Sequence, residues 1–212
     1  MWMEVLVEGA SDVPAVTEIL TRRFGLRAGE HFRVHPHRGK GKLPANSLAR
    51  PQPKHQGLLD QLPAKLRGYA KSLTPGSLVL VVVDVDDEPC QDLLKALKQM
   101  LDSLPQKPEV LFRLAIEETE SWFISDLQAL ELAYPARVKK SVLKGIAPDQ
   151  IVGAWERLAQ ALGMDLREIS PVSKHDWATK ISPHLDLVNP PSPSLAKLIQ
   201  GVEAYLDREG VT

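Results

Sequence analysis

Residues 78–83, LVLVVV, are the feature that most constrains the fold. Six apolar residues follow one another without a polar break and run directly into Asp84. A strand with one solvated face alternates apolar and polar residues, whereas a continuous apolar run predicts a strand that helices cover on both faces. Helical patterns lie before and after this run. The order of strands and helices therefore predicts an α/β fold with a mostly parallel, Rossmann-like sheet.

Strands and helices continue to alternate along the chain as far as about residue 130. Further strands are expected at residues 2–8, 31–38 and 109–116, and helices at 12–24, 57–73, 89–102 and 118–133. The segment 39–57 is rich in Gly, Pro and Lys and predicts a surface loop. After about residue 130 the strand pattern fades, and three short helices are expected, within 148–162, 173–185 and 192–206. The expected organisation is an α/β domain over 1–130 with a helical extension, 131–212, packed on it.

The composition and the absence of a long apolar run favour a globular protein that does not span a membrane. The chain has 212 residues, 43% of them hydrophobic, which is enough for a packed core. No apolar run approaches the roughly 20 residues that a membrane span needs, and the first residues lack the basic start of a signal peptide. The single cysteine, Cys90, has no partner for a disulfide or a zinc site. We expect a cytoplasmic protein without a membrane partner.

Charge is distributed unevenly although the net charge is only −1. The segment 22–71 carries twelve Lys and Arg against two acidic residues, and the segment 84–126 carries eleven Asp and Glu against four basic residues. This polarity is expected of a protein that holds cations and polyanions together. Two solvated faces of opposite sign explain it equally well.

Carboxylates follow two of the expected strands where each strand ends. Glu8 follows the first strand, and Asp84 and Asp86 follow the central one. The carboxyl ends of parallel strands meet at one edge of the sheet, where ligands bind. Carboxylates that converge there repel unless a proton or a cation joins them. Oxygen ligands suit Mg²⁺ or Mn²⁺, so a metal site is predicted, although Asp87 can instead cap the next helix.

A third acidic cluster lies at 117–120. Glu117 ends the expected strand at 109–116, and Glu118 and Glu120 fall in the first turn of the next helix. Acidic residues in a first turn also stabilise the helix dipole. The alternative is that Glu118 or Glu120 reaches the same crevice and completes a site for one or two metal ions. Trp122 and Phe123 are expected in the core.

The motifs VEGASD after the first strand and VVVDVDD on a later strand resemble the Toprim domain, which has a Glu after its first strand and a DxD pair further on. Toprim domains occur in topoisomerases, bacterial primases, small RNA-maturing nucleases and OLD-family nucleases. The stretches EETESWFISD and NPPSPSLAKL resemble a Toprim-like bacterial family of unknown function that is related to the OLD type. The Toprim-like part covers roughly residues 1–130, and the narrower likeness extends nearly to the C-terminus.

The resemblance implies roles for particular residues. Glu8 matches the Toprim glutamate, a metal ligand or general acid/base, and Asp84 and Asp86 match ligands for Mg²⁺. The family's acidic helix corresponds to Glu118, Glu120, Trp122 and Asp126, and Lys174 corresponds loosely to a phosphate contact. The chain departs from topoisomerases and primases, because it has no domain with a strand-passing tyrosine and no zinc-binding module.

Together these observations predict a nuclease that hydrolyses nucleic-acid phosphodiesters with Mg²⁺ or Mn²⁺. The expected catalytic residues are Glu8, Asp84, Asp86, Glu120 and Lys174. The expected metal ligands are Glu8, Asp84, Asp86, Asp87, Glu118 and Glu120. Nucleic-acid phosphates are expected at Arg38, Lys40, Lys42, Arg50 and Lys54, where loop glycines permit close approach of the backbone.

Two other functions stay open. The chain can be a non-catalytic regulatory or scaffolding subunit of an ATPase, since the resemblance implies an ATPase partner and a role in defence against phage. It can also be a metal-dependent phosphohydrolase that acts on a small molecule, which predicts a closed pocket rather than a long basic groove. A separate metal site at His31, His35, His37 and His55 is the weakest alternative.

Overall fold

The computed structural model describes residues 1–86 and 88–211. Four parallel strands form one sheet in the order β2-β1-β3-β4. The strands are β1 (Trp2–Val7), β2 (Phe32–Pro36), β3 (Ser77–Asp84) and β4 (Glu109–Ala115). The expected α/β class with a parallel, Rossmann-like sheet is confirmed. The strand β3 lies inside the sheet, and its residues from Ser77 to Val83 are all buried, as the apolar run predicts.

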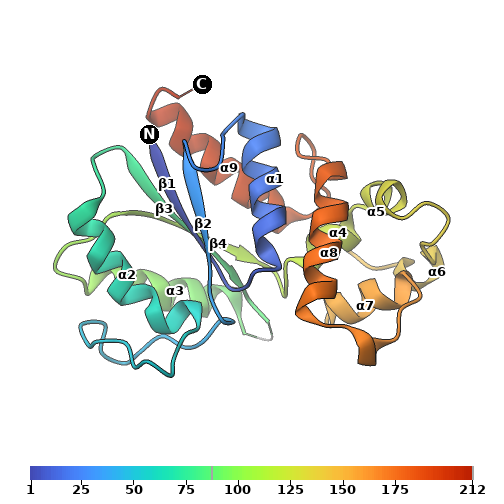
Figure 1. Ribbon diagram of the computed structural model, residues 1–212, viewed down its shortest axis with the longest axis horizontal. Coiled ribbons are helices and arrows are strands. Elements are labelled where there is room, and N and C mark those ends of the chain that lie inside the picture. The colour runs from blue at the N-terminus through green and yellow to red at the C-terminus, as the bar shows by residue number, and fades with distance from the viewer. Residues whose placement is uncertain (87, 212) are drawn as a thin grey trace.

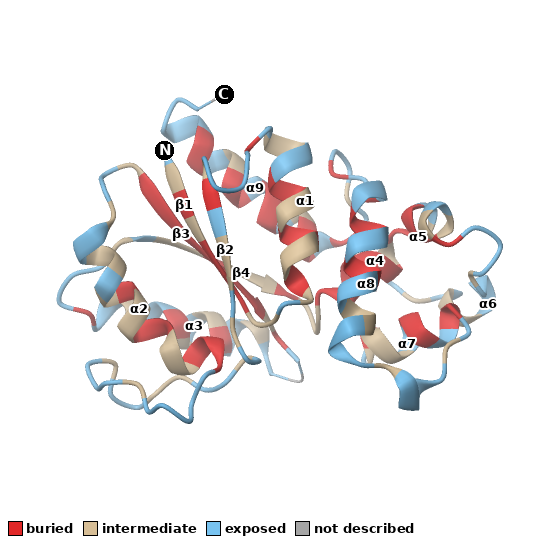
Figure 2. Cartoon of the chain, viewed as in Figure 1, coloured by how far each residue is buried: buried red, intermediate tan, exposed pale blue. Residues whose placement is uncertain are grey.

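Helices cover both faces of the sheet (Figure 1). One layer contains α1 (Asp12–Phe24) and α9 (Pro193–Arg208), and the other contains α2 (Leu58–Ser72) and α3 (Cys90–Asp102). Alternate residues of β3 divide between the two layers, with Leu80 packed on the first side and Val81 on the second. Figure 2 shows the buried segments of the strands between the two helical layers.

The remaining helices gather beside the sheet in the right half of Figure 1. They are α4 (Glu120–Ser125), α5 (Leu127–Ala133), α6 (Lys140–Leu143), α7 (Ala154–Ala161) and α8 (Pro171–Ile181), with short 3-10 turns at Leu166–Glu168 and Ser182–His184. One hydrophobic cluster joins them to the sheet, because it includes Met3 and Leu80 together with Trp122, Trp177 and Leu198. The helix α9 therefore returns from the C-terminal part of the chain to cover the sheet.

Two expectations for the helices are wrong: α6 (Lys140–Leu143) was not expected, and one expected helix differs in its extent. The segment 118–133 was predicted as one helix, but it forms α4 and α5 with a break at Asp126. Asp126 leaves the helical region (φ −109°, ψ 82°), and its side chain accepts a hydrogen bond from the amide of Ala129, 2.9 Å away. Its other oxygen accepts from the amide of Asp186 at 2.8 Å. The Asp126 side chain therefore ends one helix, begins the next and holds a distant loop.

The expected core residues are found. Trp122 and Phe123 are buried. Ser192 caps α9, since its hydroxyl accepts a hydrogen bond from the amide of Leu195. None of the helices in the described ranges combines the length and the hydropathy needed to cross a bilayer.

Candidate functional site

The ends of two adjacent strands place Glu8 and Asp84 next to each other. Glu8 directly follows β1, and Asp84 is the last residue of the neighbouring strand β3. The backbone amide of Asp84 donates a hydrogen bond of 2.9 Å to Glu8 Oε1. The parallel register aligns the ends of the two strands, so two acidic residues that are 76 positions apart in sequence lie side by side.

A cavity of about 640 Å³ opens over these strand ends. Its acidic side is lined by Glu8, Asp12, Asp84, Asp86, Glu118 and Glu120. The rest of its wall includes His37, Arg38, Trp155, Ile169, Pro171 and Lys174. The strand ends, the first turns of α1 and α4, and the helices α7 and α8 therefore share one pocket.

Asp12 belongs to this pocket, although the sequence did not indicate it as a site residue. Its side chain is buried and accepts hydrogen bonds from the amide of Gly9, at 2.9 Å, and from the hydroxyl of Thr119, at 3.1 Å. Ser11, the residue that precedes α1, makes no capping hydrogen bond with its side chain. The contact with Thr119 joins the start of α1 to the start of α4. No spacing in the sequence indicates this pairing, because 107 residues separate its members.

Glu118 and Glu120 enter the pocket together with a lysine from α8. The ammonium of Lys174 lies 3.3 Å from Glu118 Oε1 and 3.3 Å from Glu120 Oε1. It also lies 5.4 Å from the ring centroid of Trp155. Glu118 has a further partner, since its Oε2 accepts from the amide of Trp155 at 3.3 Å. Three helices thus supply the groups around one ammonium.

The neighbouring Glu117 has a structural role. Its carboxylate accepts from the amides of Gly153 and Ala154 at the start of α7, the second at 2.8 Å. Its backbone is left-handed, with φ 62°, and its carbonyl accepts from the amide of Asp86, whose φ is 53°. Two non-glycine residues in this sparsely populated conformation therefore meet where β3 and β4 end.

The crowding of carboxylates changes their acidity. Burial, with repulsion from Asp12 and Asp86, raises the pKa of Glu8 to about 8, although the amide of Asp84 opposes this. Burial and the adjacent Glu120 raise the pKa of Glu118 to about 7. Burial also raises the pKa of Asp12, of Asp84 and of Glu120. Burial is the largest cause of each shift, and neighbouring carboxylates add to it.

Asp86 lies at the margin of the pocket, in a turn after the strand. Its carboxylate is half exposed and pairs with Lys40 at 3.0 Å. Lys40 also contacts Glu88, at 3.2 Å, and donates to the carbonyl of Val85. Lys40, which was expected to contact nucleic acid, therefore binds groups of its own chain. It joins the loop at 39–57 to the end of β3.

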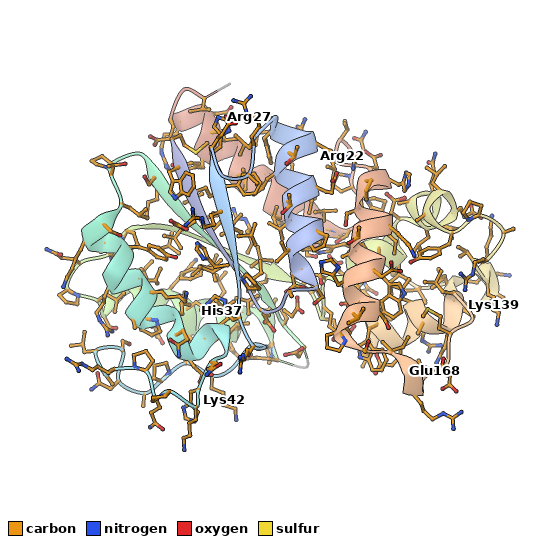
Figure 3. All side chains as sticks on the ribbon, in the orientation of Figure 1. Arg22, Arg27, His37, Lys42, Lys139 and Glu168 are labelled. Carbon is orange, nitrogen blue, oxygen red and sulfur yellow. The ribbon has the colours of Figure 1, made fainter. Side chains whose placement is uncertain are left out.

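The other residues expected to contact nucleic acid lie in different parts of the structure. Arg38 lines the acidic cavity, whereas Lys42 and Arg50 line a different cavity of about 320 Å³ between the loop and α2, and Lys54 is exposed. In Figure 3, Lys42 lies at the margin of the molecule below α2, away from His37. The five expected contacts for nucleic acid do not share one cavity.

The glycines of the loop at 39–57 allow the backbone to lie close to another part of the same chain, the start of α2. A side-chain carbon at Gly57 would lie 2.5 Å from the backbone of Gly41. The amides of Leu58 and Leu59 at the start of α2 donate to the carbonyls of Gly39 and Lys40. These contacts fold the loop onto α2, where phosphate contacts of the backbone were expected.

His37 contributes its ring to the wall of the pocket. Its Nδ1 lies 2.8 Å from the carbonyl oxygen of Val7, and burial lowers its pKa. Its Nε2 is buried and has no hydrogen-bond partner among residues 1–86 and 88–211. The expected alternative, a metal site made of histidines, is not formed there.

The donor set of the pocket suits a hard divalent cation, because its acidic side offers only carboxylate oxygens. Within the described part of the chain, however, no three His, Cys, Asp or Glu side chains lie close enough together to hold an ion. Mg²⁺ typically uses one or two carboxylates and keeps its waters. Glu8 and Asp84, with Asp86 beside them, meet that smaller requirement. The expected ligand Asp87 lies outside the described residues.

A family model described as Domain of unknown function (DUF4276) matches residues 7–203. The matched range contains Glu8, Asp84, Asp86, Glu120 and Lys174. No curated protein and no solved structure matches the chain.

Proposed function

The chain belongs to the DUF4276 family, and we propose that it is a nuclease that hydrolyses nucleic-acid phosphodiesters with Mg²⁺ or Mn²⁺. One observation carries this proposal. Glu8, Asp84 and Asp86, from the ends of two adjacent parallel strands, line the same cavity as Arg38 and Lys174. A site that binds a divalent cation and a phosphate together needs this combination of acidic and basic groups. The resemblance to Toprim nucleases supports the same conclusion.

Glu8, Asp84 and Asp86 are the residues that would hold the cation. A bound divalent ion polarises a phosphoryl oxygen and lowers the pKa of water. The raised pKa of Glu8 and of Asp84 supports this assignment, because burial and mutual repulsion make the two carboxylates costly to ionise without a nearby cation.

The other groups bind and orient the phosphate. Arg38 and Lys174 supply positive charge on the wall of the cavity, where they would contact phosphate oxygens. Without a bound cation, the pKa of Glu8, about 8, leaves its carboxyl largely protonated at neutral pH. A general-acid role for Glu8, the other role that the resemblance implies, would therefore require Asp84 and Asp86 to hold the cation without it.

A phosphohydrolase for a small substrate is the second candidate. The acidic cavity is partly closed by Trp155, Ile169 and Pro171, and its volume of about 640 Å³ is that of a typical small-molecule site. Lys40 is engaged with Asp86 and Glu88 rather than extended toward a strand of nucleic acid. A mononucleotide or another small phosphate ester would fit such a pocket.

The resemblance extends the proposal to an ATPase partner, a cytoplasmic location and a role in defence against phage. A non-catalytic subunit of an ATPase complex would need no divalent ion in this pocket. Metal dependence therefore separates that alternative from both enzymatic functions.

The test is incubation of the purified chain with supercoiled plasmid, single-stranded DNA, RNA and a mononucleotide, in Mg²⁺ or Mn²⁺ and in EDTA. Asp86→Ala is compared with Asp102→Ala, whose side chain is 71% exposed on α3 and outside the cavity. Metal-dependent cleavage of a polymer, lost in Asp86→Ala alone, supports the nuclease. Hydrolysis of the mononucleotide alone supports the second candidate, and no hydrolysis in either metal contradicts both.

A further inference from the structure

A second cavity adjoins the acidic one on the side of β2. It has a volume of about 580 Å³ and lies between the end of β2, the loop at 39–57 and α2. The two cavities share Ala10, His37 and Arg38 in their walls. His37 directly follows β2 and lies beside α2 (Figure 3). A ligand bound over the strand ends can therefore extend past Arg38 into the second cavity.

The charge of the second cavity is opposite to that of the first. Arg38 and Lys65 line it, and its other described lining residues include no Asp or Glu. The first cavity, in contrast, is lined by six carboxylates. A cavity that has only basic and neutral side chains attracts anions and repels cations. The second cavity therefore suits a phosphate group rather than a metal ion.

Lys65 on α2 supplies a cation that the chain leaves without a partner. It is half-buried, and within the described part of the chain its ammonium has no hydrogen bond or ion pair. Lys40 and Lys174 are also half-buried, but each of them pairs with two carboxylates. Burial lowers the pKa of Lys65, and the charge of Glu4 opposes this effect without an ion pair. A partly buried cation of this kind costs free energy, which a bound anion would offset.

Hydrogen bonds to the loop fix the walls around these two cations. The side-chain amide of Gln56 donates to the carbonyl of Pro53 at 3.0 Å, and that of Gln61 donates to the carbonyl of His55. The backbone amide of Arg38 donates to the carbonyl of Gln56 at 3.1 Å. Gln56, Gln61 and Pro53 all line the cavity. The cavity is therefore shaped before a ligand enters it, which reduces the ordering cost of binding.

We propose that this cavity is a second phosphate subsite, in which Arg38 and Lys65 bind a phosphate of the nucleic-acid strand next to the one at the strand ends. The inference rests on the proposed function and specifies its substrate as a polymer. A nucleoside monophosphate has a single phosphate and fills only one of the two cavities. A strand carries phosphates at a regular spacing, so one phosphate can lie over the strand ends while a neighbouring one contacts Arg38 and Lys65.

The test is the affinity of a short single-stranded DNA and of an RNA of the same length, measured by fluorescence anisotropy in EDTA at several salt concentrations. EDTA keeps cleavage and metal binding out of the measurement. Lys65→Met removes the charge and keeps a long side chain. It should weaken the binding of both polymers roughly 3- to 10-fold and reduce the slope of log affinity against log salt by about 0.7, the value for one phosphate of a single strand.

Lys71→Met is the matched control, because Lys71 is exposed on the same helix and lines neither cavity. It should keep the affinity and the salt slope of the parent. Equal affinity and equal slope for the parent and Lys65→Met would overturn the subsite.

Two further variants separate charge from packing. Lys65→Arg keeps the positive charge and should bind both polymers as the parent does. If it weakens binding as much as Lys65→Met, the lysine acts through packing and the subsite is overturned. Arg38→Gln removes the other cation at an exposed position and should cause a similar loss of affinity and slope. This variant decides the question if Lys65→Met does not fold.

The outcomes separate this inference from the proposed function. Metal-dependent cleavage, with an affinity that does not depend on Lys65, would leave the nuclease standing and remove the subsite. Affinity that depends on Lys65, without cleavage in Mg²⁺ or Mn²⁺, would retain the subsite and contradict the nuclease. If both hold, Lys65→Met should raise KM for the polymer with little change in kcat, since Lys65 contacts a phosphate that does not react.

Discussion

The amide of Asp84 donates a 2.9 Å hydrogen bond to the carboxylate of Glu8, so the ends of β1 and β3 share one acidic group. This contact has two consequences. It fixes Glu8 against the neighbouring strand, and it brings its charge beside that of Asp84. The arrangement is stable in the absence of a cation only if protons replace the missing positive charge.

The first prediction concerns the pH dependence of the metal-free protein. The pKa of Glu8 is about 8 in the folded chain against an ordinary value of 4.5. Between these values the folded state binds more protons than the unfolded state, so the free energy of unfolding falls as pH rises from about 5 to 8. Each unit of pKa difference corresponds to about 1.4 kcal/mol. Asp84, Glu118 and Glu120 act in the same direction.

Urea denaturation in EDTA at a series of pH values measures this dependence. Glu8→Gln should have a shallower slope than the parent and should be more stable than the parent at pH 8. Added Mg²⁺ should restore stability to the parent at pH 8 and have less effect on Glu8→Gln. Equal slopes for the two proteins would show that Glu8 does not titrate in this range.

The second prediction concerns the contact between the loop at 39–57 and α2. Gly57→Ala would place a side-chain carbon 2.5 Å from the backbone of Gly41, which cannot move without displacing the loop. We expect a loss of about 1–3 kcal/mol in the free energy of unfolding. Gly68→Ala is the matched control, because it lies inside α2 with open space around it. It should stabilise the chain by roughly 0.5–1 kcal/mol.

The third prediction concerns the link between α4 and α9. The indole nitrogen of Trp122 donates to the hydroxyl of Ser194 at 2.9 Å, and both residues are buried. Ser194→Ala leaves a buried donor without its partner, which costs about 1–3 kcal/mol. Ser72→Ala, at an exposed position at the end of α2, should change stability by less than about 0.5 kcal/mol. Chemical denaturation of both variants provides the comparison, and equal stabilities would exclude a contribution of this hydrogen bond.

The sequence predicted the sheet well because apolar runs identify buried strands. The unbroken LVLVVV run predicted a strand with helices on both sides, and the structure confirms it. The convergence of Glu8 and Asp84 followed from the same argument, since parallel strands end at one edge. Both predictions needed only the apolar pattern of single strands and the rule that parallel strands end at one edge of the sheet.

The rest of the pocket depends on contacts that no local pattern encodes. Asp12 is indistinguishable in sequence from an ordinary helix cap, and its contact with Thr119 depends on how α1 meets α4. Trp155 lies on a helix that has no expected relation to the strand ends, and for Lys174 only the resemblance, not a pattern in the residues, implied such a relation. The packing of α7 and α8 brings both residues to Glu118. The break at Asp126 was missed because the helical pattern continues across it.

The central claim is that the strand-end carboxylates support metal-dependent hydrolysis of phosphodiesters. The most direct measurement is the initial rate at which the chain nicks supercoiled plasmid in Mn²⁺, for the parent, Asp86→Ala and Asp102→Ala, each at equal concentration and with folding verified. The account predicts that Asp86→Ala loses activity by on the order of 100-fold or more, as loss of a cation ligand requires, while Asp102→Ala keeps the rate of the parent. Equal rates for all three, or cleavage that persists in EDTA, would contradict it.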